Sequence, residues 1–280
     1  MSALALGQAS QHQGSRVHLY FRTPLTLRFA SLGSGSEGNA LLVECADSLL
    51  MMDCGFGLAE TETRMARLGV TPADLDAIVV THEHSDHIGG VARFARKHQL
   101  PVWLTHGTAT MWREGSMPSP LVHYVDPHEI FSVGAIEVRP YTVPHDAREP
   151  VQYVFSDGAV KLGVLTDTGS LTPHIAESLN ACDALVLECN HDLDMLMRGP
   201  YPANLKKRVA GKFGHLDNAT AAQLLSIIDC SKLKHILAAH LSAQNNLPEL
   251  AQAALAASLS CETEWVGIAA QDAGFDWRAI

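Results

Sequence analysis

The segment that most constrains the fold is THEHSDHIGG, which spans residues 81–90 and directly follows the apolar run AIVV. It holds four potential metal ligands: His82, His84, Asp86 and His87. Side chains two positions apart in an extended segment point to the same side, so the first two rings can bind one ion together. All four groups are too close in sequence to surround one tetrahedral ion comfortably, but they can serve two neighbouring ions that find further ligands elsewhere.

Several apolar segments that read as β-strands end on a side chain that can bind a metal or a proton. These runs include SLLMM, AIVV, EVRPYTVP, KLGVL, DALVLE and HILAA, and helix patterns such as LAETETRMAR lie between some of them. The residues at or just after their ends are Asp53, His82, His145, Asp167, Glu188 and His240. Because strand ends on one edge of a sheet converge in α/β proteins, we expect these residues to form a single polar site.

The alternation of strands and helices continues without a linker, a low-complexity stretch or a strong repeat, which predicts one layered α/β domain. We place this domain at residues 24–280, and we expect residues 1–23, which lack periodicity, to be a flexible N-terminal extension. Of the 280 residues, 47% are hydrophobic, which is ample for a large core. The formal net charge of −10 does not indicate a broad nucleic-acid-binding face, so an anionic substrate would need a local positive site.

Cysteine usage and hydropathy predict the compartment. The six cysteines contain no CxxC pair, and no hydrophobic signal segment opens the chain. No apolar run approaches the roughly 20 residues that a transmembrane helix needs. We therefore expect a cytoplasmic protein with free thiols and no membrane contact.

The motif HxHxDH, followed at a distance by a histidine, an aspartate and a histidine, resembles the metallo-β-lactamase superfamily. The resemblance implies an α/β fold of the αββα four-layer sandwich type, with the site at one edge of two sheets. It implies two metal ions, the first held by His82, His84 and His145 and the second by Asp86, His87 and His240. Asp167 would bridge the ions, and Asp53 would orient one of the ligands.

Further segments resemble the YycJ/WalJ family within that superfamily. They are LGSGSEGNALLVE, VPHDAREPVQYVF, LECNHDLDMLMRGPYPANLKKRV, GHLDN and AAHLSAQNN, and the resemblance covers residues 25–277. It implies a 5′-to-3′ exonuclease that acts on DNA ends, an activity that belongs to DNA repair. The segment GHLDN departs from the pattern, because Asp217 stands where serine is commoner and any substrate contact by that serine has no counterpart here.

The residues fit phosphodiester hydrolysis by two metal ions. Two divalent ions bring about four positive charges; Asp86, Asp167 and a bridging hydroxide remove three, which leaves about one for an anionic substrate. We expect the bridging hydroxide to be the nucleophile and Asp86 to orient it. We assign the general acid to His215, oriented by Glu188, since this Glu-then-His order resembles that of tRNA 3′-processing members. Nitrogen and carboxylate ligands suit zinc, manganese or iron, and the sequence does not choose among them; we name zinc first, manganese second and iron third.

A basic run provides candidate substrate contacts. The segment NLKKRVAGK carries Lys206, Lys207, Arg208 and Lys212 shortly before His215. We expect Lys207 and Arg208 to contact DNA, although the same run could be a solvated helix face. A helix is expected to begin near Asn218, whose free backbone N–H groups could hold a phosphate.

Other functions remain open at this point. A glyoxalase II-like hydrolase of a thioester or ester shares the HxHxDH loop, but the C-terminal helices that would bind its substrate are not evident. A secreted β-lactamase is disfavoured by the missing signal segment and by the additional pair of Glu188 and His215. A tRNA-processing nuclease should carry an extended RNA-binding arm, and none is evident in the sequence. A nuclease with a large inserted cap fits poorly, because only about 70 residues separate Asp167 from His240. A non-catalytic metal-binding accessory protein would not need the complete ligand set.

Overall fold

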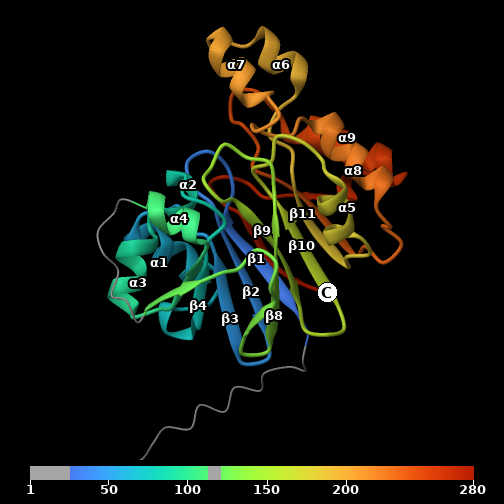
Figure 1. Cartoon of the computed structure of the whole chain (residues 1–280). Helices are drawn as coiled ribbons and strands as arrows, with labels where there is room; N and C mark the ends of the chain where they lie inside the picture. Colours follow the sequence, from blue (N-terminus) through green and yellow to red (C-terminus); the bar gives the residue numbers. More distant parts are fainter. Residues whose placement is uncertain (1–25, 113–120) are drawn as a thin grey trace, which may run out of the picture.

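Two β-sheets lie face to face in the computed structural model, which describes residues 26–112 and 121–280 (Figure 1). The extension expected over residues 1–23 lies outside these described residues. The first sheet has the order β14 (Phe275–Ala279), β1 (Arg28–Gly33), β2 (Ala40–Cys45), β3 (Ser48–Met52), β4 (Ala77–Val79), β5 (Val102–Leu104) and β6 (Val122–Tyr124). The second has the order β13 (Val266–Ile268), β12 (His235–Ala239), β11 (Ala184–Glu188), β10 (Lys161–Leu165), β9 (Val151–Ser156), β8 (Ile136–Thr142) and β7 (Phe131–Val133).

Helices cover the outer faces of both sheets (Figure 1). Beside the first sheet lie α1 (Leu58–Arg67), α2 (Ser85–Ile88), α3 (Val91–His98) and α4 (His106–Met111). The second sheet is covered by α5 (Pro173–Leu179), α8 (Asn218–Ile227) and α9 (Pro248–Leu259). Short 3₁₀ turns occur at Pro72–Asp74 and Thr263–Trp265. This arrangement is the expected αββα four-layer sandwich. Among the helices of the described segments, none has the length and hydropathy that crossing a bilayer requires.

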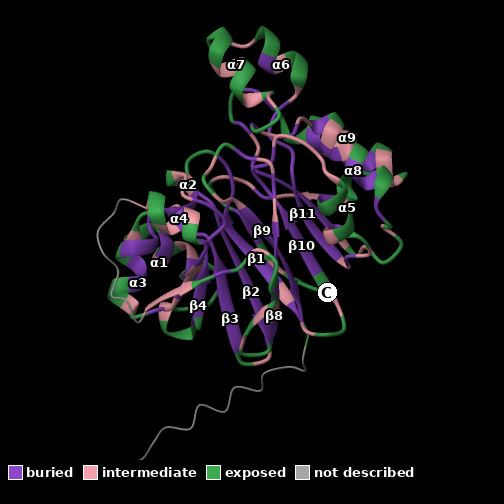
Figure 2. Ribbon diagram, in the orientation of Figure 1, coloured by how far each residue is buried: buried purple, intermediate pink, exposed green. Residues whose placement is uncertain are grey.

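Three apolar layers hold the sandwich together. The strand SLLMM shows how the sequence builds two of them, because successive side chains point to opposite faces. Leu50 and Met52 pack between the two sheets, whereas Leu49 and Met51 pack against the helices on the outside of the first sheet. A third cluster fills the space between the second sheet and α5, α8 and α9. Figure 2 shows the consequence, with strands buried throughout their centres and helices exposed on their outer sides.

The direction of the strands decides where the site lies. In the first sheet, β3 and β4 are parallel. In the second, β10, β11 and β12 are parallel, and β8 runs in their direction because β9 is antiparallel to both β8 and β10. All six strand ends that were expected to carry polar residues therefore belong to strands that share a direction within their sheet. The carboxyl ends of such strands meet at one edge, which is where sites form in α/β proteins.

A two-helix arm, which was not expected from the sequence, projects from this edge (Figure 1). It consists of α6 (Leu193–Arg198) and α7 (Ala203–Val209), and most of its surface is exposed (Figure 2). The basic run therefore lies largely on a helix of the arm. Backbone contacts close the base of the arm: His191 and Asp217 form a β-bridge, and the amide of Asn218 donates to the carbonyl of His191 at 3.0 Å.

Gly55 offers a test of how closely residues 81–90, here called the histidine loop, are packed. A Cβ atom at this position would lie 1.9 Å from the carbonyl oxygen of Asp86, so Gly55→Ala must displace that backbone. We expect a loss of about 3 kcal/mol in the free energy of unfolding, at the upper end of overpacking effects. Urea unfolding followed by circular dichroism measures the change.

Gly57→Ala is the matched control, because a Cβ atom there meets nothing within 4 Å. Gly57 is the N-cap of α1, so the control should cost no more than about 1 kcal/mol. Equal losses in the two variants would contradict close packing of the loop against Gly55.

Candidate metal centre and adjoining acid–base pair

The seven expected metal ligands come together at the shared edge of the two sheets. Their side chains form three overlapping groups in which the potential ligand atoms lie within 4.8 Å of one another. The groups are His82, His84 and His145; Asp86, His87 and His240; and His82, His87 and Asp167. A fourth group combines Asp167 and His240 with Glu188 and His215. The structure thus brings the expected ligands and the expected acid–base pair into one continuous cluster.

Three of the strand-end residues turn the chain sharply. Asp53, Asp167 and His240 have φ angles of 59°, 52° and 54°, in the left-handed region that residues other than glycine seldom occupy. Asp53 and His240 directly follow β3 and β12, and Asp167 lies two residues after the end of β10. The turn directs the side chain out of the sheet, and a conformation of this kind costs about 1–3 kcal/mol that the surrounding contacts must offset. Such strain is often found at functional sites.

Most of the histidines are held by one ring nitrogen, which leaves the other facing the cluster. His87 Nδ1 lies 2.8 Å from the carboxylate of Asp53, and His145 Nδ1 lies 3.0 Å from the carbonyl of Gly214. His82 Nδ1 lies 3.0 Å from the hydroxyl of Thr81. The Nε2 atoms are thereby free to act as ligands, because neighbouring groups fix the tautomer and the orientation of each ring.

The inward atoms lie close to one another. Nε2 of His145 is 3.2 Å from Nδ1 of His84. Nε2 of His240 is 3.3 Å from Oδ2 of Asp86 and 3.5 Å from Oδ1 of Asp167. Nε2 of His87 is 3.1 Å from Oδ2 of Asp167. Oδ1 of Asp167 also lies 3.9 Å from Nε2 of His145, so this carboxylate lies between the two histidine sets, where a carboxylate shared by two ions would be needed.

Two atoms in this cluster lack hydrogen bonds and support a bound cation. Nε2 of His82 is buried without a hydrogen-bond partner among the described residues. Oδ2 of Asp167 is also buried and has no partner in hydrogen-bond geometry, although it lies 3.1 Å from His87. Buried polar atoms are almost always paired, so unpaired ones call for an explanation such as an ion. Both belong to a donor set of imidazole nitrogens and carboxylate oxygens, which suits divalent transition metals.

The electrostatics of the cluster point in the same direction. Burial lowers the pKa of His82, and the charge of His87 lowers it further. Burial would also lower the pKa of His87 and of His240, but the carboxylate of Asp167 and its neighbours raise it, for His240 to about 10. The buried carboxylates are thus stabilised by nearby positive charge, which a proton or a metal ion can supply.

Asp53 is fully buried and makes contacts that fix the histidine loop. Its Oδ1 accepts a hydrogen bond from the amide of Thr81 at 2.8 Å, and its Oδ2 accepts one from the hydroxyl of Thr81 at 2.9 Å. The same Oδ2 lies 2.8 Å from Nδ1 of His87. This is the place expected for a residue that orients a ligand.

Glu188 and His215 form a hydrogen-bonded pair beside the cluster. His215 Nδ1 lies 2.7 Å from Oε1 of Glu188, whose other oxygen accepts from the amides of Thr168 and Leu216. Burial raises the pKa of Glu188, but the charge and hydrogen bond of His215 outweigh this effect and lower it to about 2. Burial lowers the pKa of His215, yet the charge and hydrogen bond of Glu188 raise it overall. The pair consequently favours an ionised carboxylate and a protonated imidazole.

An open cleft of about 400 Å³ gives access to the site. It is lined by Ser36, His84, Ser85, Asp86, Asp146, Asp167, Tyr201, Leu205, Arg208, Val209, Gly214, His215 and His240. The side chain of His215 is 21% exposed at this cleft. Residues of the arm and of the metal cluster thus share one concave surface, to which His215 is accessible.

Two residues of the site carry no signal when the sequence is taken alone. Asn39 Nδ2 lies 3.4 Å from Asp86 Oδ2 and 3.2 Å from His87 Nε2, across a long sequence separation. Asp146 accepts a hydrogen bond from Arg208 Nε at 2.6 Å, and its other oxygen lies 3.6 Å from Nε2 of His145. The segments LGSGSEGN and VPHDAREP contain them, but nothing within either segment singles out one polar residue over its neighbours.

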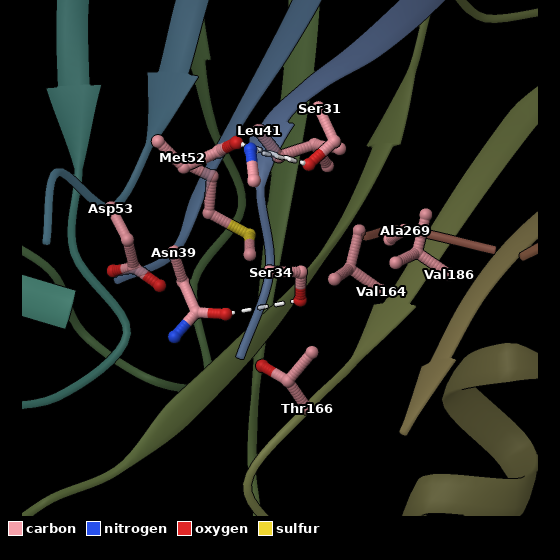
Figure 3. A pocket seen from close by; sticks show the side chains of 12 residues that line it. Ser31, Ser34, Asn39, Leu41, Met52, Asp53, Val164, Thr166, Val186 and Ala269 are labelled. Carbon is pink, nitrogen blue, oxygen red and sulfur yellow. Dashed lines mark hydrogen bonds between the residues drawn. The ribbon is translucent and has the colours of Figure 1, made fainter. Parts of the chain in front are cut away.

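A small cavity lies next to Asn39 and Asp53, between the two sheets (Figure 3). Its volume of about 20 Å³ matches a single water molecule. Ser34 donates a hydrogen bond to Asn39 Oδ1 at 3.0 Å there, and its hydroxyl also accepts from the amide of His240 at 3.0 Å. This contact links the loop that carries Asn39 to the end of β12.

The expected substrate contacts need one correction. Asn218 is buried, and its side-chain amide exchanges two hydrogen bonds with Asn246, so it does not reach the cleft. The amides of Ala219 and Thr220 at the start of α8 are already capped by Asp217. The helix end therefore has no free N–H groups of that kind for a phosphate, and the expectation for Asn218 was wrong. Asp217, the departure in the GHLDN segment, is a helix cap.

The basic residues of the arm differ in their surroundings. Arg208 lines the cleft but is paired with Asp146, and Lys206 Nζ donates to the carbonyl of Met197 at 2.7 Å within the arm. Lys207 has no ion pair with any residue that the structure describes. Of Lys206, Lys207 and Arg208, Lys207 thus has the positive charge with the fewest interactions with the protein.

The chain matches known proteins over most of its length. A family model described as a β-lactamase superfamily domain matches residues 49–240. The chain is 37% identical to the exodeoxyribonuclease YycJ of Bacillus anthracis, over 81% of this chain and 86% of that relative. It is 32% identical to the exodeoxyribonuclease WalJ of Streptococcus pneumoniae, over 86% of this chain and 91% of that relative. The solved structure of the metallo-β-lactamase-fold protein YhfI from Bacillus subtilis has a TM-score of 0.71 at 17% identity, covering 91% of this chain and 100% of YhfI, a likeness that concerns the fold alone.

Replacing Asp53 tests the role of its contact with His87. Asp53→Asn removes the charge that orients the ring, and we expect the affinity for Zn²⁺ or Mn²⁺ to fall about 10- to 100-fold. Competition with a chelating dye, on protein first stripped of metal, measures this affinity. The control is Asp276→Asn, a highly exposed carboxylate paired with Arg67 on the surface. An unchanged affinity in folded Asp53→Asn would show that the buried carboxylate serves folding only.

Proposed function

Because the chain belongs to the metallo-β-lactamase superfamily, and within it to the YycJ/WalJ-like group, we propose that it removes nucleotides from DNA ends. It is a metal-dependent hydrolase, and the bonds it cleaves are phosphodiesters. The observation that carries the proposal is the hydrogen-bonded pair of Glu188 and His215, which opens onto the same cleft as the metal cluster. The exodeoxyribonuclease names of the two relatives support DNA as the substrate, and 5′-to-3′ polarity is part of the proposal.

The residues proposed to hold two divalent ions are those of the cluster. His82, His84 and His145 would hold one ion, Asp86, His87 and His240 the other, and Asp167 would contact both. We propose zinc or manganese, with iron as a further option. Bound ions would lower the pKa of a water molecule, polarise the phosphoryl oxygens and offset the charge of the substrate.

The side chains of the protein orient the attacking water and supply the proton for the leaving group. Asp86 is 21% exposed at the cleft, and its Oδ2 lies 3.3 Å from His240, so it can both bind a metal and orient the attacking water. Glu188 holds His215 by Nδ1, which leaves Nε2 to carry a proton toward the cleft. We propose that this proton passes from His215 Nε2 to the 3′-oxygen of the leaving nucleotide.

Positive charge on the arm would guide the substrate. Lys207 and Arg208 are our proposed phosphate contacts, and Arg208 can exchange its partner Asp146 for a phosphate because both line the cleft. We further propose a cytoplasmic location, in keeping with six cysteines that are all unpaired.

A turnover panel tests the proposal. Purified protein with added Mn²⁺ or Zn²⁺ should shorten single- or double-stranded DNA, and should do so faster than it cleaves RNA, a thioester or a lactam. Strands labelled at either end report the polarity. Asp86→Ala should lose nearly all turnover while its circular dichroism spectrum stays unchanged. Intact DNA together with rapid thioester cleavage would replace the nuclease with the glyoxalase II-like hydrolase, and no turnover on any substrate would favour an accessory protein.

His215→Ala distinguishes an acid from a structural residue. The variant should lose about 10²- to 10⁴-fold in rate on DNA, because a natural 3′-oxygen leaves poorly without a proton. It should stay near normal on a nitrophenyl phosphodiester, whose leaving group needs no acid, and it should keep its full metal content. Glu188→Gln should show the same pattern in weaker form, since Glu188 acts through His215.

His128→Ala, which removes an exposed histidine outside the site, is the control for this comparison. Equal losses on both substrates would mean that His215 positions the phosphate or the structure. A fall in metal content would place His215 among the metal ligands instead.

A further inference from the structure

Phe213 is unusually exposed for its residue type. Its exposed fraction is 61%, the largest among the large hydrophobic side chains that the structure describes. It lies in the connection between α7 and His215, in the sequence AGKFGH. Single exposed apolar residues are common and carry no meaning by themselves. The surroundings of Phe213, however, indicate a role in binding.

The backbone that carries Phe213 is held firmly. Its carbonyl accepts a hydrogen bond from the amide of Asp146 at 3.0 Å, and the hydroxyl of Ser170 donates to the carbonyl of Lys212 at 3.1 Å. A Cβ atom on Gly169 would lie 2.3 Å from the amide nitrogen of Gly214, so the two backbones pack directly against each other. The ring is therefore presented to solvent from a fixed position.

That position adjoins the reacting groups. The next residue, Gly214, lines the cleft and accepts the hydrogen bond from His145 Nδ1. The residue after it is His215, the proposed acid. Two residues span at most about 7 Å, so the Cα atom of Phe213 lies close to that of His215, within reach of a nucleotide whose phosphodiester is bound in the cleft.

Two uncompensated positive charges lie shortly before the ring in sequence. Lys212 precedes Phe213 directly, and Lys207 lies on the last turn of α7. Neither ammonium group has an ion pair with a residue in the described segments, whereas Arg208 is paired with Asp146. An exposed aromatic ring beside cations is the combination with which proteins bind single-stranded nucleic acid: the ring stacks on a base and the cations contact the backbone.

We infer that Phe213 is a stacking platform for an unpaired nucleobase next to the phosphodiester in the cleft. The inference rests on the proposed nuclease function and adds to it that the substrate strand is single-stranded at this point. Stacking on aromatic side chains tolerates any base, since every base has a π-face. The site would thus select unpaired ends without selecting a sequence.

The experiment compares normal and abasic oligonucleotides. Fluorescence anisotropy measures the binding of a labelled single strand that carries either natural nucleotides or abasic residues at its first three positions. Wild-type protein should bind the natural strand about 10- to 100-fold more tightly than the abasic one. Phe213→Ala should bind both strands with the weaker affinity, and Phe213→Trp should restore the preference.

Two control variants separate stacking from other effects. Ile227→Ala removes a side chain of comparable exposure at the end of α8 and should leave binding unchanged. Lys207→Ala should weaken the binding of both strands alike and reduce its dependence on salt.

The outcomes distinguish this inference from the function on which it rests. Equal binding of natural and abasic strands by wild type, or an unchanged preference in Phe213→Ala, overturns the stacking platform even if DNA is cleaved. A preference that depends on Phe213 supports the platform even if the protein cleaves no DNA, in which case the nuclease proposal alone fails.

Discussion

The histidine loop is held in place by one buried carboxylate. Asp53 lies in a left-handed turn at the end of β3 and accepts hydrogen bonds from the backbone and the hydroxyl of Thr81. It also fixes the ring of His87. Removing a charged group from water costs several kcal/mol unless it is paired and hydrogen-bonded, and each contact of Asp53 offsets that cost. The geometry of the whole cluster follows, because the loop that Asp53 anchors supplies four of the seven proposed ligands.

The cluster could be predicted from the sequence because its signals are local. HxHxDH places its ligands within one short segment, and the apolar runs that end on Asp167, Glu188 and His240 identify strands by composition and length. Their convergence needs only the rule that strands of one direction end at the same edge. The pairing of Glu188 with His215, whose 2.7 Å contact joins residues 27 positions apart, was expected from the resemblance to tRNA 3′-processing members and not from a local signal.

Other features could not be predicted because they depend on distant contacts. Asn39 reaches the cluster only because the loop after β1 folds beneath residues 86 and 87. Asp146 is one of several polar residues in its segment, and only the arm reveals its partner Arg208. The start of α8 was foreseen correctly, yet Asn218 faces Asn246 because the tertiary packing buries it. Short strands such as β5, with three residues, give too little periodicity to be recognised.

The closed base of the arm makes it a separable piece of the architecture. The bridge between His191 and Asp217 joins the two ends of the arm. The conformational entropy lost on closing such a loop grows only slowly with its length, so the length of the arm has little effect on the stability of the fold. An arm of different length or charge can therefore replace this one between His191 and Asp217 without moving either sheet. His215, however, lies at the C-terminal end of the arm, two residues before Asp217. A change in the length of the arm that also shifted its C-terminal end would therefore move His215, the proposed acid, relative to the metal cluster.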